Sequence, residues 1–330
     1  METIKNAVKT VSETVTGGSE SKGPMTAFPT GKDIPAQSQR PQPGLEAEME
    51  PAPIVSALEC LDAEGNPSLV EYKGADKLRG KKALITGGDS GIGRSVAVMF
   101  AREGANIAFT YVRGLEERDA KDTEVMLHKE GVKVVAIAVD YDSFGSEEAS
   151  EKLVNEAVRG LGGLDILVNN AGEQHFCADI TQIDEKQVER TFRSNILSMI
   201  MITKHAVPHL KKGSSIINTT SVTAYKGSAG LIDYSSTKGA IVSFTRALSS
   251  QLAPKGIRVN AVAPGPIWTA LQVSSRKDEE IEGYGDGKCP LGRVGQPSEC
   301  GTSFVFLASA DGSFFTGQVL HPNGGYYMAT

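Results

Sequence analysis

The sequence predicts a doubly wound α/β fold, in which helices cover both faces of a parallel sheet. From Gly80 onward, short β-rich runs alternate with longer segments of helical periodicity. The short runs are apolar almost throughout, as in strands that are buried on both faces. The chain has 330 residues, of which 40% are hydrophobic and 22% are charged, so it can fill a core and is not disordered as a whole.

Seven strands and six helices are expected between residue 80 and the end. The strands are expected at residues 82–86, 106–111, 133–139, 165–169, 214–220, 257–263 and 318–321. The helices are expected at residues 92–103, 116–129, 146–159, 185–211, 234–252 and 297–308. This alternation indicates one seven-stranded domain over residues 80–330, with no internal repeat beyond it.

The N-terminal part of the chain is rich in proline. Eight of the 15 prolines lie before Ser68, and each fixes φ and removes a hydrogen-bond donor. Residues 1–44 are therefore expected to form a mostly disordered arm. The alternative is an arm that packs on a neighbouring subunit. Residues 45–79 contain enough apolar side chains to dock on the domain that follows.

Charge and composition limit the partners. The balance of 34 Lys and Arg against 40 Asp and Glu gives a net charge of −6, which argues against nucleic acid. No apolar run approaches the roughly 18 residues that a membrane span needs. The first residues lack the features of a secretory or transit peptide, so a cytoplasmic protein is expected. Neither the four scattered cysteines nor the histidines have metal-site spacing, and no metal is expected.

A glycine-rich turn follows the first apolar strand. Residues 86–93 read Thr-Gly-Gly-Asp-Ser-Gly-Ile-Gly and open the first helix. Glycines there permit a tight turn and let the backbone approach a pyrophosphate, while the helix start offers free N–H groups. The turn predicts a dinucleotide site, and the alternative is a purely structural turn. The expected contacts are Gly87, Ser90, Gly91, Ile92 and Gly93.

The end of the second strand indicates which dinucleotide binds. An acidic residue there would bind the adenosine ribose and repel a 2′-phosphate. This chain instead has Arg113, with no acid before Glu116. NADP is therefore predicted rather than NAD, although Arg113 can also be an ordinary exposed arginine. The charged residues 116–122 are expected to form a solvated helix face.

Tyr234 and Lys238 are four residues apart in a helical segment, so their side chains share one face. A tyrosine with its ordinary pKa of about 10 is a poor base at neutral pH. A nearby ammonium lowers that pKa, as a general acid/base for alcohol–ketone interconversion requires. The alternative is a plain amphipathic helix face.

Three further sequence features add to the evidence from Tyr234 and Lys238. Ser221 comes directly after an apolar strand, so it lies where a doubly wound sheet binds its ligand and can donate to a developing alkoxide. Another strand ends in Asn-Asn-Ala-Gly at residues 169–172, and Asn195 interrupts the expected helix 185–211. Each alone can be a cap or a turn, but together they indicate an active site.

These motifs, in this order, resemble those of the short-chain dehydrogenase/reductase family over residues 77–330, about three quarters of the chain. The glycine turn, the Asn-Asn-Ala-Gly element and the Pro-Gly loop at residues 264–269 match the family. Longer matches resemble a subgroup of general-stress oxidoreductases and glucose/ribitol-dehydrogenase-like proteins that carry an N-terminal arm. The resemblance implies a Rossmann sheet and a catalytic tetrad of Asn195, Ser221, Tyr234 and Lys238.

The resemblance also implies roles for single residues. Tyr234 would be the proton donor or acceptor, and Lys238 would bind the nicotinamide ribose and lower the tyrosine pKa. Ser221 would hold the substrate oxygen, and Asn195 would position a water in a proton relay. Further cofactor contacts would be Asp140 near the adenine, Asn170 near the ribose, and Ile267 and Thr269 at the carboxamide.

The function expected from the sequence is an NADP(H)-dependent oxidoreductase that interconverts a carbonyl and an alcohol. Its substrate would be a sugar or polyol, or a ketone of secondary metabolism. The polar segment 271–290 predicts a mobile substrate lid. By resemblance, the helices 185–211 and 234–252 would pair subunits into a homotetramer. The alternative is a dinucleotide-binding sensor or scaffold without turnover, whose arm is a docking peptide.

Overall fold

The computed structural model describes residues 26–285, 287 and 289–328. The chain divides into two compact units, and the larger comprises residues 29–57 and 71–330. The described part of the smaller unit comprises residues 26–28 and 58–70. Thr26 Oγ1 donates to Glu59 there at 2.7 Å. A two-stranded sheet is formed by β1 (Ala57–Leu61) and β2 (Pro67–Glu71).

The larger unit contains a seven-stranded parallel sheet, which confirms the predicted fold class. The strand order is β5-β4-β3-β6-β7-β8-β9. The order reverses between β3 and β6, and ligands of such sheets bind at that point, beyond the carboxyl ends of the strands. The strands are β3 (Lys82–Ile85), β4 (Asn106–Val112), β5 (Val134–Val139), β6 (Ile166–Asn169), β7 (Ser215–Thr219), β8 (Arg258–Val262) and β9 (Val319–Leu320).

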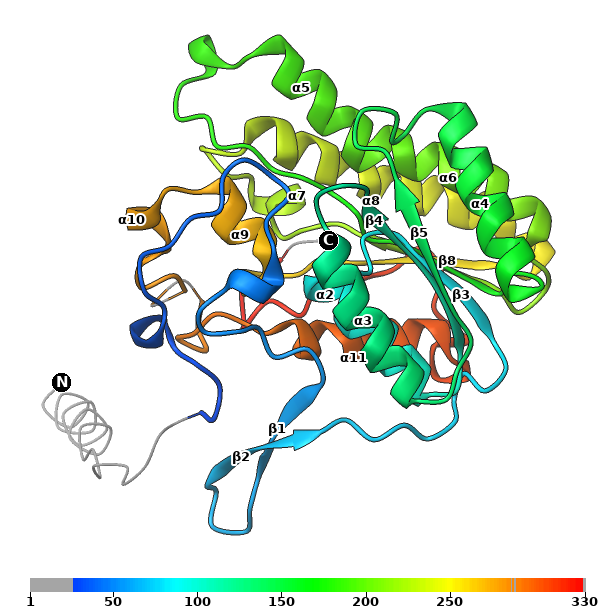
Figure 1. Ribbon diagram of the computed structural model, residues 1–330, viewed down its shortest axis with the longest axis horizontal. Helices are drawn as coiled ribbons and strands as arrows, with labels where there is room; N and C mark the ends of the chain where they lie inside the picture. Colours follow the sequence, from blue (N-terminus) through cyan, green and yellow to red (C-terminus); the bar gives the residue numbers. More distant parts are fainter. Residues whose placement is uncertain (1–25, 286, 288, 329–330) are drawn as a thin grey trace, which may run out of the picture. The chain divides into compact units, whose positions relative to one another are not determined.

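Helices cover both faces of this sheet (Figure 1). One layer consists of α2 (Gly91–Arg102), α3 (Glu117–Lys129) and α11 (Pro297–Ala308). The other contains α4 (Glu147–Leu161), α5 (Glu185–Phe192), α6 (Ser198–Ala206) and α8 (Ile232–Leu252). Local signals set the helix ends: Ser146 caps α4 through a bond from Ala149 N, and Gly162 ends it at φ 78°.

The helix expected at residues 185–211 is interrupted. After α5, residues Arg193–Leu197 form a π-helical turn, and α6 is followed by a 3₁₀ turn at Val207–His209. Pro208 cannot donate a backbone hydrogen bond, which explains why the α-helix stops before it. The π turn contains Asn195, and such turns often occur at functional sites.

Residues 29–57, called the arm from here on, belong to the larger unit and pack on the rest of it. Ile34 and Met49 are buried in a cluster with Trp268, Val273 and Tyr284. This packing differs from the disorder expected for residues 1–44, because the segment after β8 supplies an apolar surface for the arm. The same expectation for residues 1–25 falls outside the described part of the chain.

The predicted lid, residues 271–290, includes most of α9 (Ala270–Ser275) and all of α10 (Asp278–Ile281). Another short helix, α7 (Thr223–Lys226), follows Ser221. Gln39 N donates to Val273 O at 2.9 Å, so the arm is bonded directly to α9. The lid segment is therefore in contact with the arm along its first helix.

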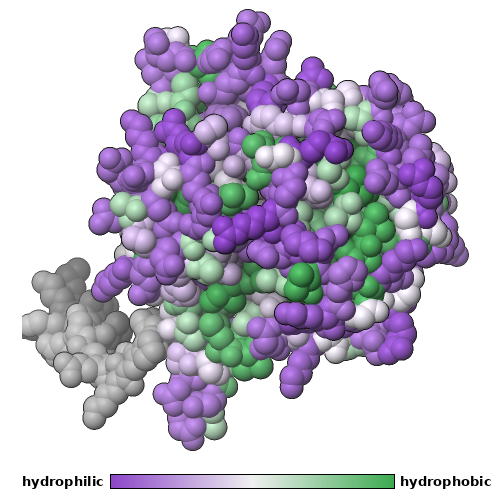
Figure 2. Space-filling view, in the orientation of Figure 1, coloured by the Kyte–Doolittle hydropathy of each residue, from purple (hydrophilic) through white to green (hydrophobic). Residues whose placement is uncertain are grey.

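The described residues contain no helix long and apolar enough to cross a membrane. Within the same residues, no group of three or more His, Cys, Asp and Glu side chains is placed to hold a metal ion. The four cysteines are unpaired. Figure 2 shows polar side chains over most of one face, broken by apolar patches. Apolar surface among polar residues is ordinary for a folded protein.

Candidate active site

The glycine turn connects β3 to α2 and lies close to β4, because Gly87 N donates to Thr110 Oγ1 at 3.0 Å. Gly87 has φ 60°, a conformation that suits glycine. A Cβ on Gly93 would lie 1.8 Å from Gly87 O and 2.6 Å from Asn170 Nδ2, so no larger residue fits there. The turn therefore presents main-chain atoms and the start of α2, as a pyrophosphate cradle requires.

A cavity of about 150 Å³ lies at the carboxyl edge of the sheet, beside this turn. It brings together most of the site residues predicted from the sequence. Those that line it are Gly87, Ser90, Gly91, Ile92, Asn170, Ser221, Tyr234, Lys238, Ile267 and Thr269. Gly93 packs behind the turn, whereas Asn195, Arg113 and Asp140 are not among the lining residues.

The helix α8 carries Tyr234 and Lys238 on the face that borders the cavity. The Tyr234 hydroxyl lies close enough to Ser221, which follows β7, for the Ser221 side chain to lower the Tyr234 pKa. Lys238 Nζ lies 5.3 Å from the centroid of the Tyr234 ring and donates to Thr219 O at 3.0 Å. A phenol, a hydroxyl and an amine thus meet at one end of the cavity.

Burial dominates the titration of these groups. It raises the pKa of Tyr234 to about 12, against the opposing effects of the Ser221 hydrogen bond and the Arg276 charge. Burial also lowers the pKa of Lys238 to about 8. The sequence predicts that Lys238 lowers the Tyr234 pKa, but the net shift is in the other direction. The physical reason is that removing a phenolate from water costs more than the neighbouring contacts return.

Asn195 lies one layer behind the cavity. Its Nδ2 donates to Glu173 O at 2.9 Å and to Thr237 Oγ1 at 3.1 Å, and its Oδ1 accepts from Glu173 N at 2.8 Å. Gly172 stands between Asn195 and Lys238, because a Cβ there would lie 3.1 Å from Asn195 Oδ1 and 3.5 Å from Lys238 Nζ. Asn195 therefore fixes the backbone that borders Lys238.

Asn170 fastens the glycine turn to the neighbouring strands. Its Nδ2 donates to Gly87 O at 3.0 Å and to Thr86 O at 3.2 Å, and its Oδ1 accepts from Thr219 Oγ1 at 3.3 Å. The ends of β3, β6 and β7 are thereby held together. This arrangement fixes the floor of the cavity.

A second cavity, also of about 150 Å³, shares lining residues with the first. The common residues are Ser90, Ala171, Gly172, Ala270 and Leu271. The two cavities therefore form adjoining parts of one cleft that crosses the switch point of the sheet. Its outer part is lined by the ends of β4 and β5 and, unexpectedly, by the arm residues Gln42, Pro43 and Gly44.

Arg113 and Asp140 lie together, but outside that cleft. Arg113 Nε donates to Asp140 Oδ1 at 2.9 Å, and the two side chains are 60% and 66% exposed. They follow β4 and β5 and border a further hollow, which shares Tyr111, Val139 and Phe144 with the outer part of the cleft and therefore adjoins it. The predicted adenosine-side residues are thus paired with each other at the rim.

Glu116 is not the solvated residue that the sequence indicates. It is buried, lines the outer part of the cleft, and accepts from Val112 N at 2.7 Å. Burial and the nearby Asp89 raise the pKa of Glu116 to about 9. The charged pattern of this stretch indicates exposure, and Glu117 and Arg118 are indeed exposed. Only the tertiary structure shows that Glu116, the residue before α3, is buried.

Glu46 connects the arm to the glycine turn. Its Oε2 accepts from Gly91 N at 2.5 Å, and its Oε1 accepts from Arg94 Nη1 at 2.6 Å. Arg94 also pairs with the buried Asp119 at 3.4 Å, and Asp119 accepts from Glu46 N at 2.6 Å. An acidic residue in a proline-rich arm gives no sequence signal for such a role.

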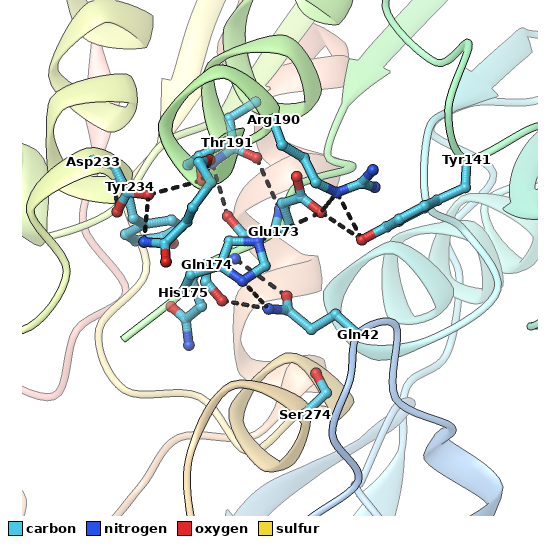
Figure 3. Close-up of polar contacts among 12 residues, drawn as sticks. Gln42, Tyr141, Glu173, Gln174, His175, Arg190, Thr191, Asp233, Tyr234 and Ser274 are labelled. Atoms are coloured by element: carbon cyan, nitrogen blue, oxygen red, sulfur yellow. Dashed lines mark hydrogen bonds and ion pairs between the residues drawn. The ribbon is translucent and has the colours of Figure 1, made fainter. Parts of the chain in front are cut away.

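Glu173 centres a further network, shown in Figure 3. Its Oε2 accepts from Tyr141 Oη at 2.9 Å and from Arg190 Nε at 3.0 Å. Burial alone would raise the pKa of Glu173, but His175, Arg190 and Tyr141 more than offset it, so the pKa is lowered. The network holds in place the chain that follows the Asn-Asn-Ala-Gly element.

The arm joins the same region through Gln42. Its side chain donates to Gln174 O and accepts from Gln174 N, the latter at 3.2 Å (Figure 3). Gln174 Nε2 in turn donates to Ser275 Oγ at 2.8 Å. Hydrogen bonds thus link three segments across the cleft: the arm, the loop after β6 and α9.

Comparisons with known proteins agree with this geometry. The family described as Enoyl-(Acyl carrier protein) reductase matches residues 87–327. A glucose and ribitol dehydrogenase of Daucus carota is 49% identical over 300 residues, which cover 90% of this chain and 98% of the relative. An Arabidopsis thaliana protein named NADPH-dependent aldehyde reductase 1, chloroplastic, is 52% identical over 294 residues, or 88% and 96% of the two chains.

The fold of this chain is also similar to that of a solved structure. A short-chain dehydrogenase from Burkholderia cenocepacia in complex with NADP superposes with a TM-score of 0.69 and is 28% identical. The match covers 76% of this chain and 98% of that one. With the sheet order, the glycine turn and the Tyr234–Lys238 helix, these matches show that the chain belongs to the short-chain dehydrogenase/reductase family.

Proposed function

We propose that this oxidoreductase uses NADP(H) to interconvert an aldehyde or ketone and an alcohol. One observation carries the proposal: Tyr234 and Ser221 line the same cavity as Lys238 and the glycine turn. A proton donor and an oxygen-binding hydroxyl are thus beside a dinucleotide cradle, which is the arrangement that carbonyl reduction requires.

The chain fits a dinucleotide because the glycine turn lines adjoining cavities that cross the switch point. Gly87, Ser90, Gly91 and Ile92 would border the pyrophosphate, and Gly93 behind them would keep the turn tight. Asn170 would lie near the ribose, Ile267 and Thr269 at the carboxamide, and Asp140 near the adenine. When bound, the reduced cofactor supplies the hydride.

NADP is proposed rather than NAD. Arg113 is exposed, and its guanidinium could exchange Asp140 for a 2′-phosphate. The printed names of the Arabidopsis relative and the Burkholderia structure, which include NADPH and NADP, support this choice.

The residue roles follow from the site. Tyr234 has a pKa of about 12, so it is protonated at neutral pH and suited to give its proton to the carbonyl oxygen. Ser221 would hold that oxygen by a second hydrogen bond. Lys238, which is charged below a pKa of about 8, would bind the ribose and stabilise the phenolate left on Tyr234. Asn195 would fix a proton relay behind Gly172.

The substrate class, assembly and compartment are also proposals. The substrate would be a sugar or polyol, or another small carbonyl compound. We propose a homotetramer in which α5, α6 and α8 pair subunits, and a cytoplasmic location that suits four unpaired cysteines.

The test is Tyr234→Phe, which keeps the ring and removes the proton. We expect NADPH oxidation with sugars, quinones and diketones to fall roughly 10²–10⁴-fold. NADPH affinity, followed by fluorescence titration, should change little. The exposed Tyr327→Phe serves as the matched control. Unchanged turnover in Tyr234→Phe would refute the assigned role, and a wild-type protein that binds NADPH but reduces nothing would favour the sensor alternative.

A further inference from the structure

A third cavity, of about 250 Å³, opens beside the catalytic residues. Tyr234 and Ser221 line it, so it meets the first cavity where the reacting oxygen would lie. Its other polar lining residues include Gln174, Gln272, Lys226 and Arg276. This is the space available to the part of the substrate away from the carbonyl.

The cavity has two cationic residues and no acidic one among its described lining residues. Arg276 donates to Gln272 Oε1 and to Ser275 Oγ, the latter at 3.3 Å, and its Cζ lies 5.4 Å from the Tyr284 ring centroid. Lys226 Nζ lies 4.4 Å from the Tyr326 ring centroid. These neighbours orient the two cations without neutralising them.

Two other cationic side chains near the cleft are paired with carboxylates. Arg94 pairs with Glu46 at 2.6 Å, and Arg190 pairs with Glu173 at 3.0 Å. Neither Arg276 nor Lys226 has an ion pair with a carboxylate in the described part of the chain. The substrate cavity therefore has a positive potential that the protein's own described residues leave uncompensated.

We infer that the substrate is a small carbonyl compound with an anionic group, a carboxylate or a phosphate, and that Arg276 and Lys226 bind this group. The inference rests on the proposed function and narrows its substrate class. The planar guanidinium of Arg276 suits either anion, because both accept two parallel hydrogen bonds. The charge of Arg276 also reaches the Tyr234 hydroxyl, whose pKa it lowers, so the anion would lie close to the carbonyl.

The experiment measures kcat/KM for matched pairs of aldehydes with NADPH: 4-carboxybenzaldehyde against benzaldehyde, and glyceraldehyde 3-phosphate against glyceraldehyde. The readout is the ratio of the anionic to the neutral substrate. We expect this ratio to exceed one by about tenfold or more for at least one pair, since a charged hydrogen bond in a partly buried site has that effect. The pair that shows it distinguishes a carboxylate site from a phosphate site.

Arg276→Gln and the double variant with Lys226→Gln should lower that ratio about tenfold. Lys277→Gln removes the same charge one residue outside the lining and should leave the ratio as in the wild type.

Calorimetry with 4-(hydroxymethyl)benzoate and benzyl alcohol gives the same preference without turnover. A wild-type ratio of one or less would overturn the inference, and so would a ratio that the double variant leaves unchanged. In either case, reduction of the neutral aldehydes would still support the proposed function. Reduction of none of the four substrates would overturn both.

Discussion

At the scale of single residues, the candidate active site shows how burial changes the ionisation of two side chains. Tyr234 and Lys238 are both buried, and burial favours the neutral form of each. The Tyr234 phenol is therefore protonated at neutral pH and can donate its proton. The pKa of Lys238 is about 8, so its ammonium begins to lose its proton just above neutral pH. Reduction is the direction in which a protonated tyrosine is the correct starting state.

The Lys238 pKa predicts a pH limit for reduction. Above a pH of about 8 the amine loses its proton and no longer stabilises the Tyr234 phenolate, so kcat/KM for carbonyl reduction should decline there. A pH profile of NADPH oxidation checks this. Lys238→Arg, which stays charged, should be slower but should lack the decline near pH 8. A wild-type rate that remains flat to pH 10 would contradict the prediction.

At the scale of elements, the arm and α9 form one packed unit. Ile34 and Met49 are buried with Trp268, and Trp268 Nε1 donates to Pro51 O at 2.8 Å. Ser38 Oγ also donates to Arg276 O at 3.0 Å, next to the substrate cavity. Loosening the arm should therefore loosen the lid segment.

Trp268→Phe tests this coupling, since it keeps an aromatic ring but removes the hydrogen bond to Pro51 and part of the buried ring volume. We expect the free energy of unfolding to fall by roughly 2 kcal/mol, because the Pro51 carbonyl loses its partner and a cavity remains. Hydrogen exchange should become faster in residues 34–51 and in α9. Tyr327→Phe at an exposed position is the control. Equal protection of both segments in Trp268→Phe and the wild type would show that the hydrogen bond does not couple them.

At the scale of the larger unit, a buried ion cluster joins three distant segments. Glu46 from the arm, Arg94 from α2 and Asp119 from α3 meet behind the glycine turn. Removing one partner of such a cluster leaves a buried charge without compensation. The cluster therefore ties the stability of the fold to the position of the arm.

Glu46→Gln should lower the free energy of unfolding by roughly 3 kcal/mol, because Arg94 then keeps only Asp119 as an acidic partner. Urea denaturation measures this loss. Glu48→Gln makes the same chemical change on an exposed residue of the same short turn and should leave stability as it is. If the two variants unfold at the same urea concentration, the cluster does not anchor the arm.

Much of the fold could be predicted because its signals are local. Apolar runs locate the strands, and the glycines at residues 86–93 locate the turn between β3 and α2. The spacing of Tyr234 and Lys238 is likewise a local property of one helix. The interruption of the helix at Asn195 was predicted, because an amide side chain is a poor helix former. Its π-turn form and the bonds between Asn195 and the distant Glu173 could not be predicted, because they involve residues far apart in the chain.

The sequence by itself determined the sheet, the glycine turn and the tyrosine–lysine face, since each depends on residues close together in the chain. Only the tertiary structure decided that Glu46 reaches Gly91, that Glu116 is buried, and that Arg276 lacks an acidic partner among the described residues. These features depend on which segments meet in space. Desolvation and charge pairing act over a few ångströms between residues that the chain separates widely, so no local pattern records them.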